Sequence, residues 1–147
     1  MKGIDVAKWN GVIDWKKVKE DGVQFAILKA INKQCKVEDA FNRNYAGALS
    51  VGLPIDVYNY SYATSVSKAT TDAQAVLNAI KGKKIGTVWL DVEDKIQMNL
   101  GMTLIDIINA YKYIIEKAGY GFGVYTGLSF YNTLIKPYHS FLDCKFW

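Results

Sequence analysis

Short apolar segments alternate with longer amphipathic segments along this chain of 147 residues. The short segments are rich in β-branched and aromatic residues and are bounded by glycine or proline, a pattern typical of buried strands. The strands predicted in this way cover residues 3–7, 23–30, 54–62, 86–93, 121–125 and 143–147. Helices are predicted between them, over residues 14–20, 37–51, 66–80 and 103–118.

The helix predicted over residues 103–118 has the clearest periodicity. Leu104, Ile107 and Ile108 begin a series of apolar residues spaced by three and four positions, which places them on one side of a helix. Thr103 is the expected N-cap, because a threonine hydroxyl can accept a hydrogen bond from a free backbone amide of the first turn.

The alternation of strands and helices predicts an α/β protein with a parallel sheet covered by helices. Such a sheet is either open and doubly wound or curved into a (β/α) barrel. The chain has neither a GxGxxG turn nor a P-loop, so a nucleotide-binding open sheet loses support. Residues 56–62 read DVYNYSY, with polar or aromatic residues at every second position, which suits the interior of a barrel.

The predicted fold is therefore a modified (β/α) barrel of the TIM type in one domain. Eight-stranded barrels usually need about 200 residues or more, whereas six strands are visible here. We expect a barrel that lacks its last strands and has open edges at residues 3–7 and 143–147. Open edges tend to pair with another chain. We therefore expect weak activity or none, and either partial disorder near the C-terminus or self-association across the open edge.

Composition and charge narrow the classes of partner. Aromatic residues make up 14% of the chain, with ten tyrosines and four tryptophans, which fits either a carbohydrate cleft or a tyrosine-rich core. The formal net charge of +4 comes with scattered lysines and no Arg-aromatic motif, so no nucleic-acid partner is expected. No run approaches the roughly 18 apolar residues of a membrane span. The chain passes from Met1 almost directly into the first strand, so no signal peptide is expected.

The chain has few of the cysteine and histidine residues that bind metal ions. Cys35 and Cys144 stand alone without a CxxC motif, and His139 is the one histidine. A zinc site or another histidine-based metal site is therefore not expected, and no cofactor is predicted. No disulfide between the two cysteines is expected.

The fourth predicted strand carries the strongest candidates for catalysis. Side chains alternate along a strand, so Trp89, Asp91 and Glu93 share one face, while the apolar residues between them face the helices. Both carboxylates fall at the C-terminal end of the strand, where the active sites of such barrels lie. Their Cα atoms are expected roughly 6.6 Å apart from the rise of a strand. That spacing suits two carboxylates acting on one glycosidic bond.

Asp5 is a third acid expected in the same lumen. It lies between Ile4 and Val6, which would face the helices, so its own side chain points inward. Glycoside cleavage needs a proton donor and a negative charge near the developing oxocarbenium ion, and crowding of acids raises the pKa of one of them. Two alternatives stay open: Asp5 is a buried aspartate satisfied by a backbone amide, or the three acids bind Mg²⁺ or Ca²⁺.

In its motifs the chain resembles the lysozymes of glycoside hydrolase family 25. The segments that carry the resemblance are GIDVAKWNG at 3–11, IDW at 13–15, FAILKA at 25–30, YSYA at 60–63, WLDVED at 89–94, AGY at 118–120 and GVY at 123–125. The resemblance implies that residues 1–147 are the N-terminal three-quarters of the catalytic domain. It implies a modified (β/α) barrel that hydrolyses the β-1,4 bond between N-acetylmuramic acid and N-acetylglucosamine. The partner would be peptidoglycan, and the protein would be secreted or phage-encoded and act at the bacterial cell wall.

The resemblance also implies roles for individual residues. Glu93 matches the general acid, Asp91 the carboxylate that stabilises charge or orients the acetamido group, and Asp5 an acid lining the site. The family is regarded as retaining, through participation of the substrate acetamide. The residues expected to bind the glycan are Tyr62, Trp89, Tyr60, Lys29 and Tyr125.

Several features qualify these expectations. Tyr58 is expected in the core, because Tyr62 lies nearer the open end of the same strand. Lys29 stands where arginine or lysine is usual and could pair with an inward acid, whereas Asp56 stands where a small residue is common. The chain also ends before the late acid and closing strand of the family. The alternative is therefore a catalytically inactive fragment that binds cell-wall saccharide. A third hypothesis is a metal-dependent barrel enzyme outside the family.

Overall fold

The six short apolar segments form the strands of one sheet in the computed structural model, which describes all 147 residues. The strands are β1 (Gly3–Val6), β2 (Phe25–Lys29), β3 (Ile55–Tyr60), β4 (Thr87–Asp91), β5 (Gly121–Tyr125) and β6 (Lys145–Phe146). The main helices are α1 (Trp15–Glu20), α2 (Phe41–Ser50), α3 (Val66–Ile80) and α4 (Met102–Lys117). Shorter helical turns are η1 (Lys8–Asn10), η2 (Lys95–Gln97), α5 (Leu128–Phe130), η3 (Tyr131–Ile135) and η4 (Lys136–Phe141).

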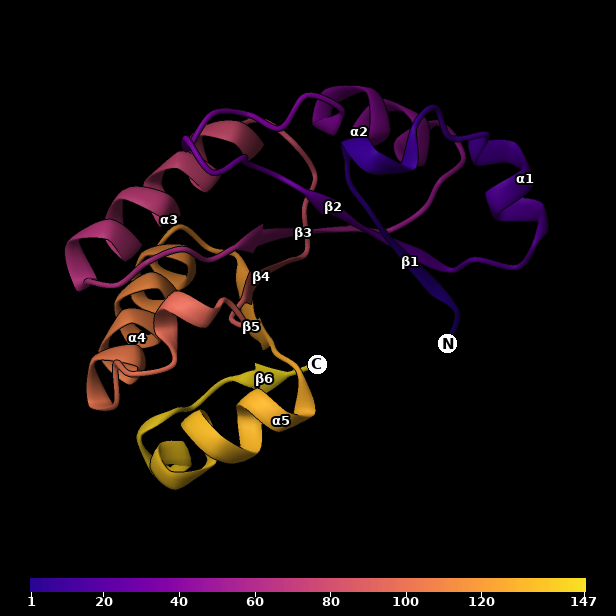
Figure 1. Cartoon of the computed structure of the whole chain (residues 1–147). Helices are drawn as coiled ribbons and strands as arrows, with labels where there is room; N and C mark the ends of the chain where they lie inside the picture. Colours follow the sequence, from indigo (N-terminus) through magenta and orange to yellow (C-terminus); the bar gives the residue numbers. More distant parts are fainter.

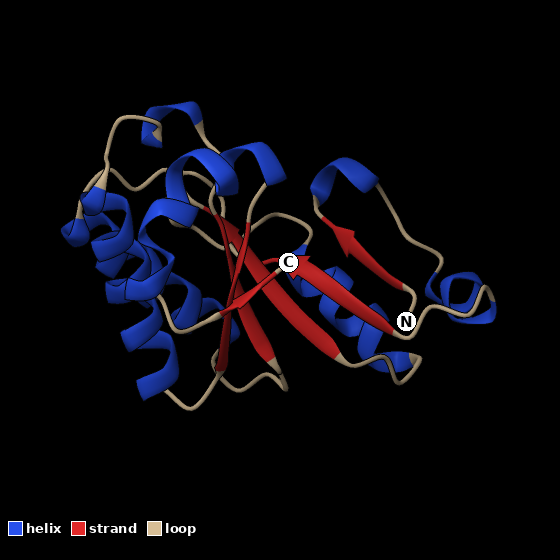
Figure 2. Cartoon of the chain, turned by 90° about the horizontal axis from the view of Figure 1, so that it is seen from below, coloured by secondary structure: helices blue, strands red, loops and turns tan.

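The strands follow one another across the sheet in chain order, and every neighbouring pair is parallel. Helices α1 to α4 lie on the outer side of the sheet (Figure 1). Figure 2 shows the strands as one curved layer inside the helices. The prediction of a TIM-like (β/α) architecture is confirmed, and β1 and β6 are the two edges of a sheet that does not close. None of the helices is long and apolar enough to cross a membrane.

The hydrophobic core lies between the convex face of the sheet and the helices. Alternate strand residues point into it, and Val57, Val88 and Val124 have no exposed surface. The apolar side of α4 meets them, with Ile107 and Ile108 fully buried, and α4 also packs against α3. Every second residue of each strand points into this core, so the residues between them point to the concave face.

The start of α4 differs from the prediction. The N-cap is Gly101 and the helix begins at Met102, so Thr103 lies inside the first turn and its assignment as N-cap is wrong. Gly101 has φ 51° and ψ −127°, a backbone conformation that favours glycine, and this turn starts the helix early. The first helix follows the expected rule: the side chain of Asp14 caps α1 by accepting a hydrogen bond from the Lys17 amide.

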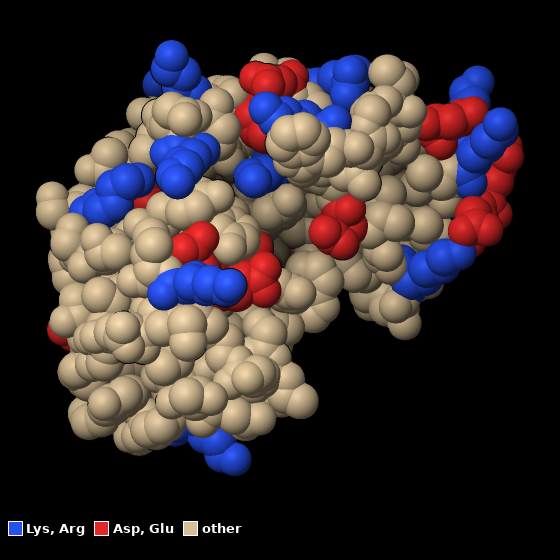
Figure 3. Space-filling model, viewed as in Figure 1, with Lys and Arg blue, Asp and Glu red and all other residues tan.

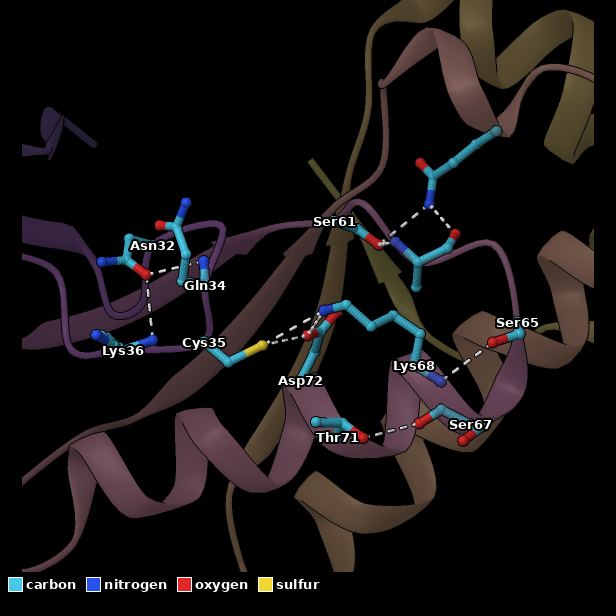
Figure 4. A network of polar contacts seen from close by, with 12 residues as sticks. Asn32, Gln34, Cys35, Lys36, Ser61, Ser65, Ser67, Lys68, Thr71 and Asp72 are labelled. Atoms are coloured by element: carbon cyan, nitrogen blue, oxygen red, sulfur yellow. Dashed lines mark hydrogen bonds and ion pairs between the residues drawn. The ribbon is translucent and has the colours of Figure 1, made fainter.

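The loop that follows β2, residues 31–37, is tied to α3 by a polar network (Figure 4). The Sγ of Cys35 donates to Oδ1 of Asp72 at 3.0 Å, and Nζ of Lys68 donates to that sulfur at 3.3 Å. Lys68 and Asp72 also form an ion pair one turn apart on α3. Cys35 and Cys144 are both free thiols. The helix expected over residues 37–51 therefore begins only at Phe41, after this loop.

Candidate active site

The deeper layer of the concave face is built around Trp89. In the sheet register Trp89 lies between Tyr58 on β3 and Gly123 on β5. A Cβ atom on Gly123 would come within 2.4 Å of the indole, so the absence of a side chain there makes room for the ring. The indole Nε1 donates to Oδ2 of Asp56 at 3.0 Å, and Oδ1 of Asp56 accepts from the Thr87 amide at 2.8 Å. Trp89 thus fills the lumen next to Tyr58, held by a partly buried aspartate.

A pocket of about 190 Å³ lies at the C-terminal ends of the strands. Its lining combines three acids with three aromatic residues: Asp5, Tyr58, Asp91, Glu93, Tyr125 and Trp147. Figure 3 shows a hollow near the centre of this face with acidic side chains beside it. The structure therefore brings the three predicted acids to one pocket, although they come from separate parts of the chain. Asp5 points into this pocket and not toward the helices.

Asp91 is the most perturbed acid of the pocket. It is the last residue of β4 and is 7% exposed, and its Oδ1 is buried without a hydrogen-bond partner. Burial and the negative charge of Glu93 raise the pKa of Asp91 from 3.8 to about 7, with a smaller contribution from Asp5, while Lys29 opposes the rise. Asp91 therefore carries a proton for part of the time near neutral pH.

Glu93 lies at the mouth of the pocket. Strand β4 ends at Asp91, so Glu93 falls just after the strand that was expected to contain it. The Val92 amide donates to the Tyr125 carbonyl at 2.8 Å, which continues the pairing with β5 and holds the segment in place. The side chain of Glu93 is exposed, unlike that of Asp91. No three acidic, thiol or imidazole side chains of the chain are placed to hold one metal ion.

The remaining predicted binding residues lie around the pocket. Tyr60 is at the end of β3, and its hydroxyl donates to Oδ2 of Asp94 at 3.2 Å. Tyr62 follows the strand and packs on Tyr60, with ring centroids 4.9 Å apart. The Nζ of Lys29 is 5.9 Å from the ring centroids of both Tyr58 and Tyr60. Tyr60, Tyr62, Lys29 and Trp89 are therefore neighbours of the pocket, whereas Tyr125 is part of its lining.

Two lining residues were not anticipated. Tyr58 was expected in the core, but it lines the pocket, and burial together with the charges of Asp5 and Asp91 raises its pKa, which keeps its hydroxyl protonated. Trp147 was not singled out at all. Its amide donates to the Val124 carbonyl at 2.9 Å, and its ring lies edge-on to Tyr125 with centroids 5.0 Å apart. Its position beside Tyr125 depends on the register between β5 and β6, which the sequence of neither strand gives.

Residues 4–147 match the family model described as glycosyl hydrolases family 25. Among curated proteins, the chain is 30% identical over 133 residues to an autolytic lysozyme of Clostridium acetobutylicum, a match that covers 90% of this chain and 40% of that protein. The chain therefore spans less than half the length of this relative.

Solved structures share the fold. The modular autolysin LytC of Streptococcus pneumoniae superposes with a TM-score of 0.81 at 29% identity, over 91% of this chain and 34% of that one. LytC has also been solved in complex with a synthetic peptidoglycan ligand. A bacterial lysozyme of Streptomyces coelicolor superposes with a TM-score of 0.75 at 25% identity, over 99% of this chain and 71% of that one.

Proposed function

The chain belongs to glycosyl hydrolases family 25, and on this premise we propose that it is a muramidase. The proposed reaction is hydrolysis of the β-1,4 bond between N-acetylmuramic acid and N-acetylglucosamine in bacterial peptidoglycan. Residues 1–147 would supply catalytic-domain residues for this reaction. The observation that carries the proposal is the pocket in which Asp5, Asp91 and Glu93 meet aromatic side chains at the C-terminal ends of the strands.

Glu93 is the proposed proton donor. It is the exposed member of the carboxylate pair and stands at the mouth of the pocket, where it can reach the oxygen that joins two sugars. Repulsion between two close carboxylates opposes the ionisation of both, and here it helps to raise the pKa of Asp91. Protonation of the leaving oxygen by Glu93 would release the sugar on the reducing-end side.

Asp91 and Asp5 are proposed to act on the sugar that becomes positively charged. Asp91 is at the end of β4 and has a buried oxygen without a partner, so it can accept a hydrogen bond from the acetamido group or stabilise positive charge in its ionised form. Asp5 adds a second negative charge on the same pocket wall. The Tyr58 hydroxyl, kept protonated by burial, can donate a hydrogen bond there.

Aromatic residues are proposed to bind the glycan. Tyr125 supplies a ring on the pocket wall, while Tyr60 and Tyr62 form a stacked pair beside it. Lys29 lies near Tyr60 and lowers the pKa of Asp91, which favours the ionised form of that acid. Trp89 would act from beneath, by supporting the wall formed by Tyr58 rather than by touching sugar.

The test is clearance of purified cell walls by matched variants. Glu93→Gln should lose at least about a hundredfold in rate, the usual scale for a positioned general acid. Asp91→Asn should lose about as much, the usual scale for a group that stabilises charge in the transition state. Glu20→Gln is the matched control, because Glu20 is an exposed carboxylate on α1 that makes no hydrogen bond or ion pair. Saccharide binding without any clearance by the unaltered chain would instead favour the inactive, saccharide-binding alternative.

We place the site of action at the bacterial cell wall, since the substrate is found there. We also propose that the edge strands β1 and β6, which pair with no further strand, allow self-association. Light scattering over a range of protein concentrations tests this, and a constant monomer mass would contradict it.

A further inference from the structure

A pocket outside the candidate active site lies between the segment that follows β1 and the segment that leads from β2 into α2. Figure 1 shows the first of these segments, in indigo, beside α2. The pocket has a volume of about 420 Å³, within the range of roughly 300–1,000 Å³ found for small-ligand sites. Both segments leave the C-terminal ends of strands, so this pocket lies at the same end of the sheet as the candidate active site. We call it the Arg43 pocket, and its lining includes Lys8, Trp9, Gly11, Val12, Asp39 and Arg43.

Arg43 gives this pocket its free positive charge. It is the one arginine among the 18 lysine and arginine residues of the chain, and its side chain is exposed. One guanidinium nitrogen, Nη2, donates to the Gly11 carbonyl at 2.7 Å, which leaves the other N–H groups available to a ligand. The Lys8 ammonium is paired with Asp39 at 3.2 Å, so its charge is already offset. Carboxylates and phosphates are the groups that the planar fork of an arginine binds with paired hydrogen bonds.

Two large apolar side chains stand beside this charge. Trp9 is 83% exposed and Val12 is 82% exposed, and both line the Arg43 pocket. A single exposed apolar side chain is common on a protein surface, but two in one pocket beside a free cation indicate a ligand with both apolar and anionic groups. The Nζ of Lys8 lies 5.0 Å from the centroid of the Trp9 ring and helps to hold the indole in place.

The buried side chain of Glu38 connects the Arg43 pocket to the candidate active site. Its Oε1 accepts from the Lys8 amide at 2.7 Å and its Oε2 accepts from the Ala40 amide at 2.8 Å, and both of these residues line the Arg43 pocket. Burial and the charges of nearby acids, Glu38 among them, raise the pKa of Tyr58, which lines the candidate active site. The two pockets are therefore neighbours.

We propose that the Arg43 pocket binds the peptide stem of peptidoglycan, with Arg43 pairing a stem carboxylate and with Trp9 and Val12 covering its alanine methyl groups. The inference rests on the proposed function, because the stem is joined to N-acetylmuramic acid, the sugar proposed to sit beside Asp5 and Asp91. The glycan strand itself is uncharged where a lactyl group carries a stem, so the carboxylates of this substrate belong to the peptide. A free cation and apolar side chains next to the sugar site therefore match the peptide and not the sugar.

The first experiment compares cleavage of peptidoglycan with and without its stems. The stem-free substrate is the same glycan after an amidase has removed the peptides, and both substrates contain the bond proposed to be cut. Arg43→Met and Trp9→Ala should each lower the ratio of kcat/KM on the stem-bearing glycan to kcat/KM on the stem-free glycan about tenfold, which is about 1.4 kcal/mol. Arg43→Lys should recover only part of this loss, because lysine keeps the charge but lacks the fork.

Two exposed residues elsewhere serve as matched controls. Lys16→Met removes a positive charge from α1, and Tyr113→Ala removes an aromatic ring that is 64% exposed on α4. Neither residue lines the Arg43 pocket, so the ratio for each control should match that of the unaltered chain. Ratios for Arg43→Met and Trp9→Ala that equal those of the controls would overturn the proposal.

A binding measurement tests the same pocket without turnover. In protein labelled with 5-fluorotryptophan, each of the four tryptophans gives its own ¹⁹F signal. Titration with the soluble stem peptide L-alanyl-γ-D-glutamyl-L-lysyl-D-alanine should shift the Trp9 signal and leave that of the buried Trp15 unmoved. The same peptide with its carboxylates converted to amides should shift the Trp9 signal less, and so should the acidic peptide added to Arg43→Met.

A stationary Trp9 signal would overturn the proposal, and so would equal shifts with the acidic and the amidated peptide. An equal shift with inorganic phosphate at the same concentration would show a general anion site and would also overturn it. A Trp9 shift with the acidic peptide, without cleavage of either glycan by the unaltered chain, would instead count against the muramidase proposal alone.

Discussion

Replacing Asp91 by asparagine is expected to stabilise the protein at pH 8 and to leave its stability at pH 4 nearly unchanged. Burial and the charge of Glu93 raise the pKa of Asp91 from 3.8 to about 7 in the folded protein, so ionisation above pH 7 opposes folding. The carboxyl contributes its full share of stability below pH 4, and that share is lost as the pH rises through 7. Asparagine resembles the protonated form at every pH.

The size of the effect follows from the same shift. A pKa change from 3.8 to about 7 corresponds to up to about 4 kcal/mol of unfolding free energy. In a domain of this size, each kcal/mol moves the melting temperature by about 3 °C. Asp91→Asn should therefore melt about 10 °C higher than the unaltered chain at pH 8. Because Oδ1 of Asp91 has no hydrogen-bond partner, the amide loses no bond at that atom.

Thermal melts at pH 4 and pH 8 measure the difference directly. Asp106→Asn is the control, because Asp106 is an exposed carboxylate on α4. The melting temperature of this variant should differ little from that of the unaltered chain at either pH. A melting temperature of Asp91→Asn no higher than that of the unaltered chain at pH 8 would contradict the raised pKa of Asp91, and so would an equal gain at both pH values. A gain in stability combined with lost activity would identify the charge of Asp91 as a cost to folding that serves the site.

Three further predictions concern the surroundings of the pocket. Tyr62→Ala should weaken saccharide binding more than it lowers the melting temperature, and the reverse order in paired binding and melting measurements would make Tyr62 a structural residue. Asp56→Asn should lower the free energy of unfolding in urea by about 1–3 kcal/mol. The Asp56 carboxylate accepts hydrogen bonds from two N–H groups, one of them from Trp89, and an amide nitrogen would then face one of these donors. An unchanged urea midpoint would show that these bonds contribute little to stability. Lys29→Met should raise the pKa of Asp91 above 7, since the lysine charge lowers it, and an NMR titration that finds it lower would contradict this.

The sequence predicted the elements well where one signal dominates. The helix expected over residues 66–80 is observed as Val66–Ile80, capped by the Ser65 side chain. The alternation around Asp91 correctly separated an apolar side, with Val88 and Leu90 buried, from a side that faces the lumen. The alternation of residues is enough for this separation, because a strand has two faces and one of them must meet the helices.

The alternation of inward and outward residues does not show where along the barrel axis a side chain lies. Tyr58 and Tyr60 share one face of β3, but the stagger of the strands pairs Tyr58 with Trp89 and Tyr60 with Asp91. That stagger comes from pairing between distant segments, so it cannot be read from either strand alone. The same limit explains why the pocket-lining Tyr58 was expected in the core. Gly101 was missed for a local reason, because Thr103 offered a stronger capping signal than a glycine does.

We propose that the chain cuts peptidoglycan on the reducing side of N-acetylmuramic acid. Digestion of purified peptidoglycan, followed by borohydride reduction and mass spectrometry of the fragments, identifies the sugar at each newly formed reducing end. We expect reduced N-acetylmuramic acid at these ends for the unaltered chain and none above background for Glu93→Gln. Reduced N-acetylglucosamine at the new ends, or equal release by Glu93→Gln, would contradict it.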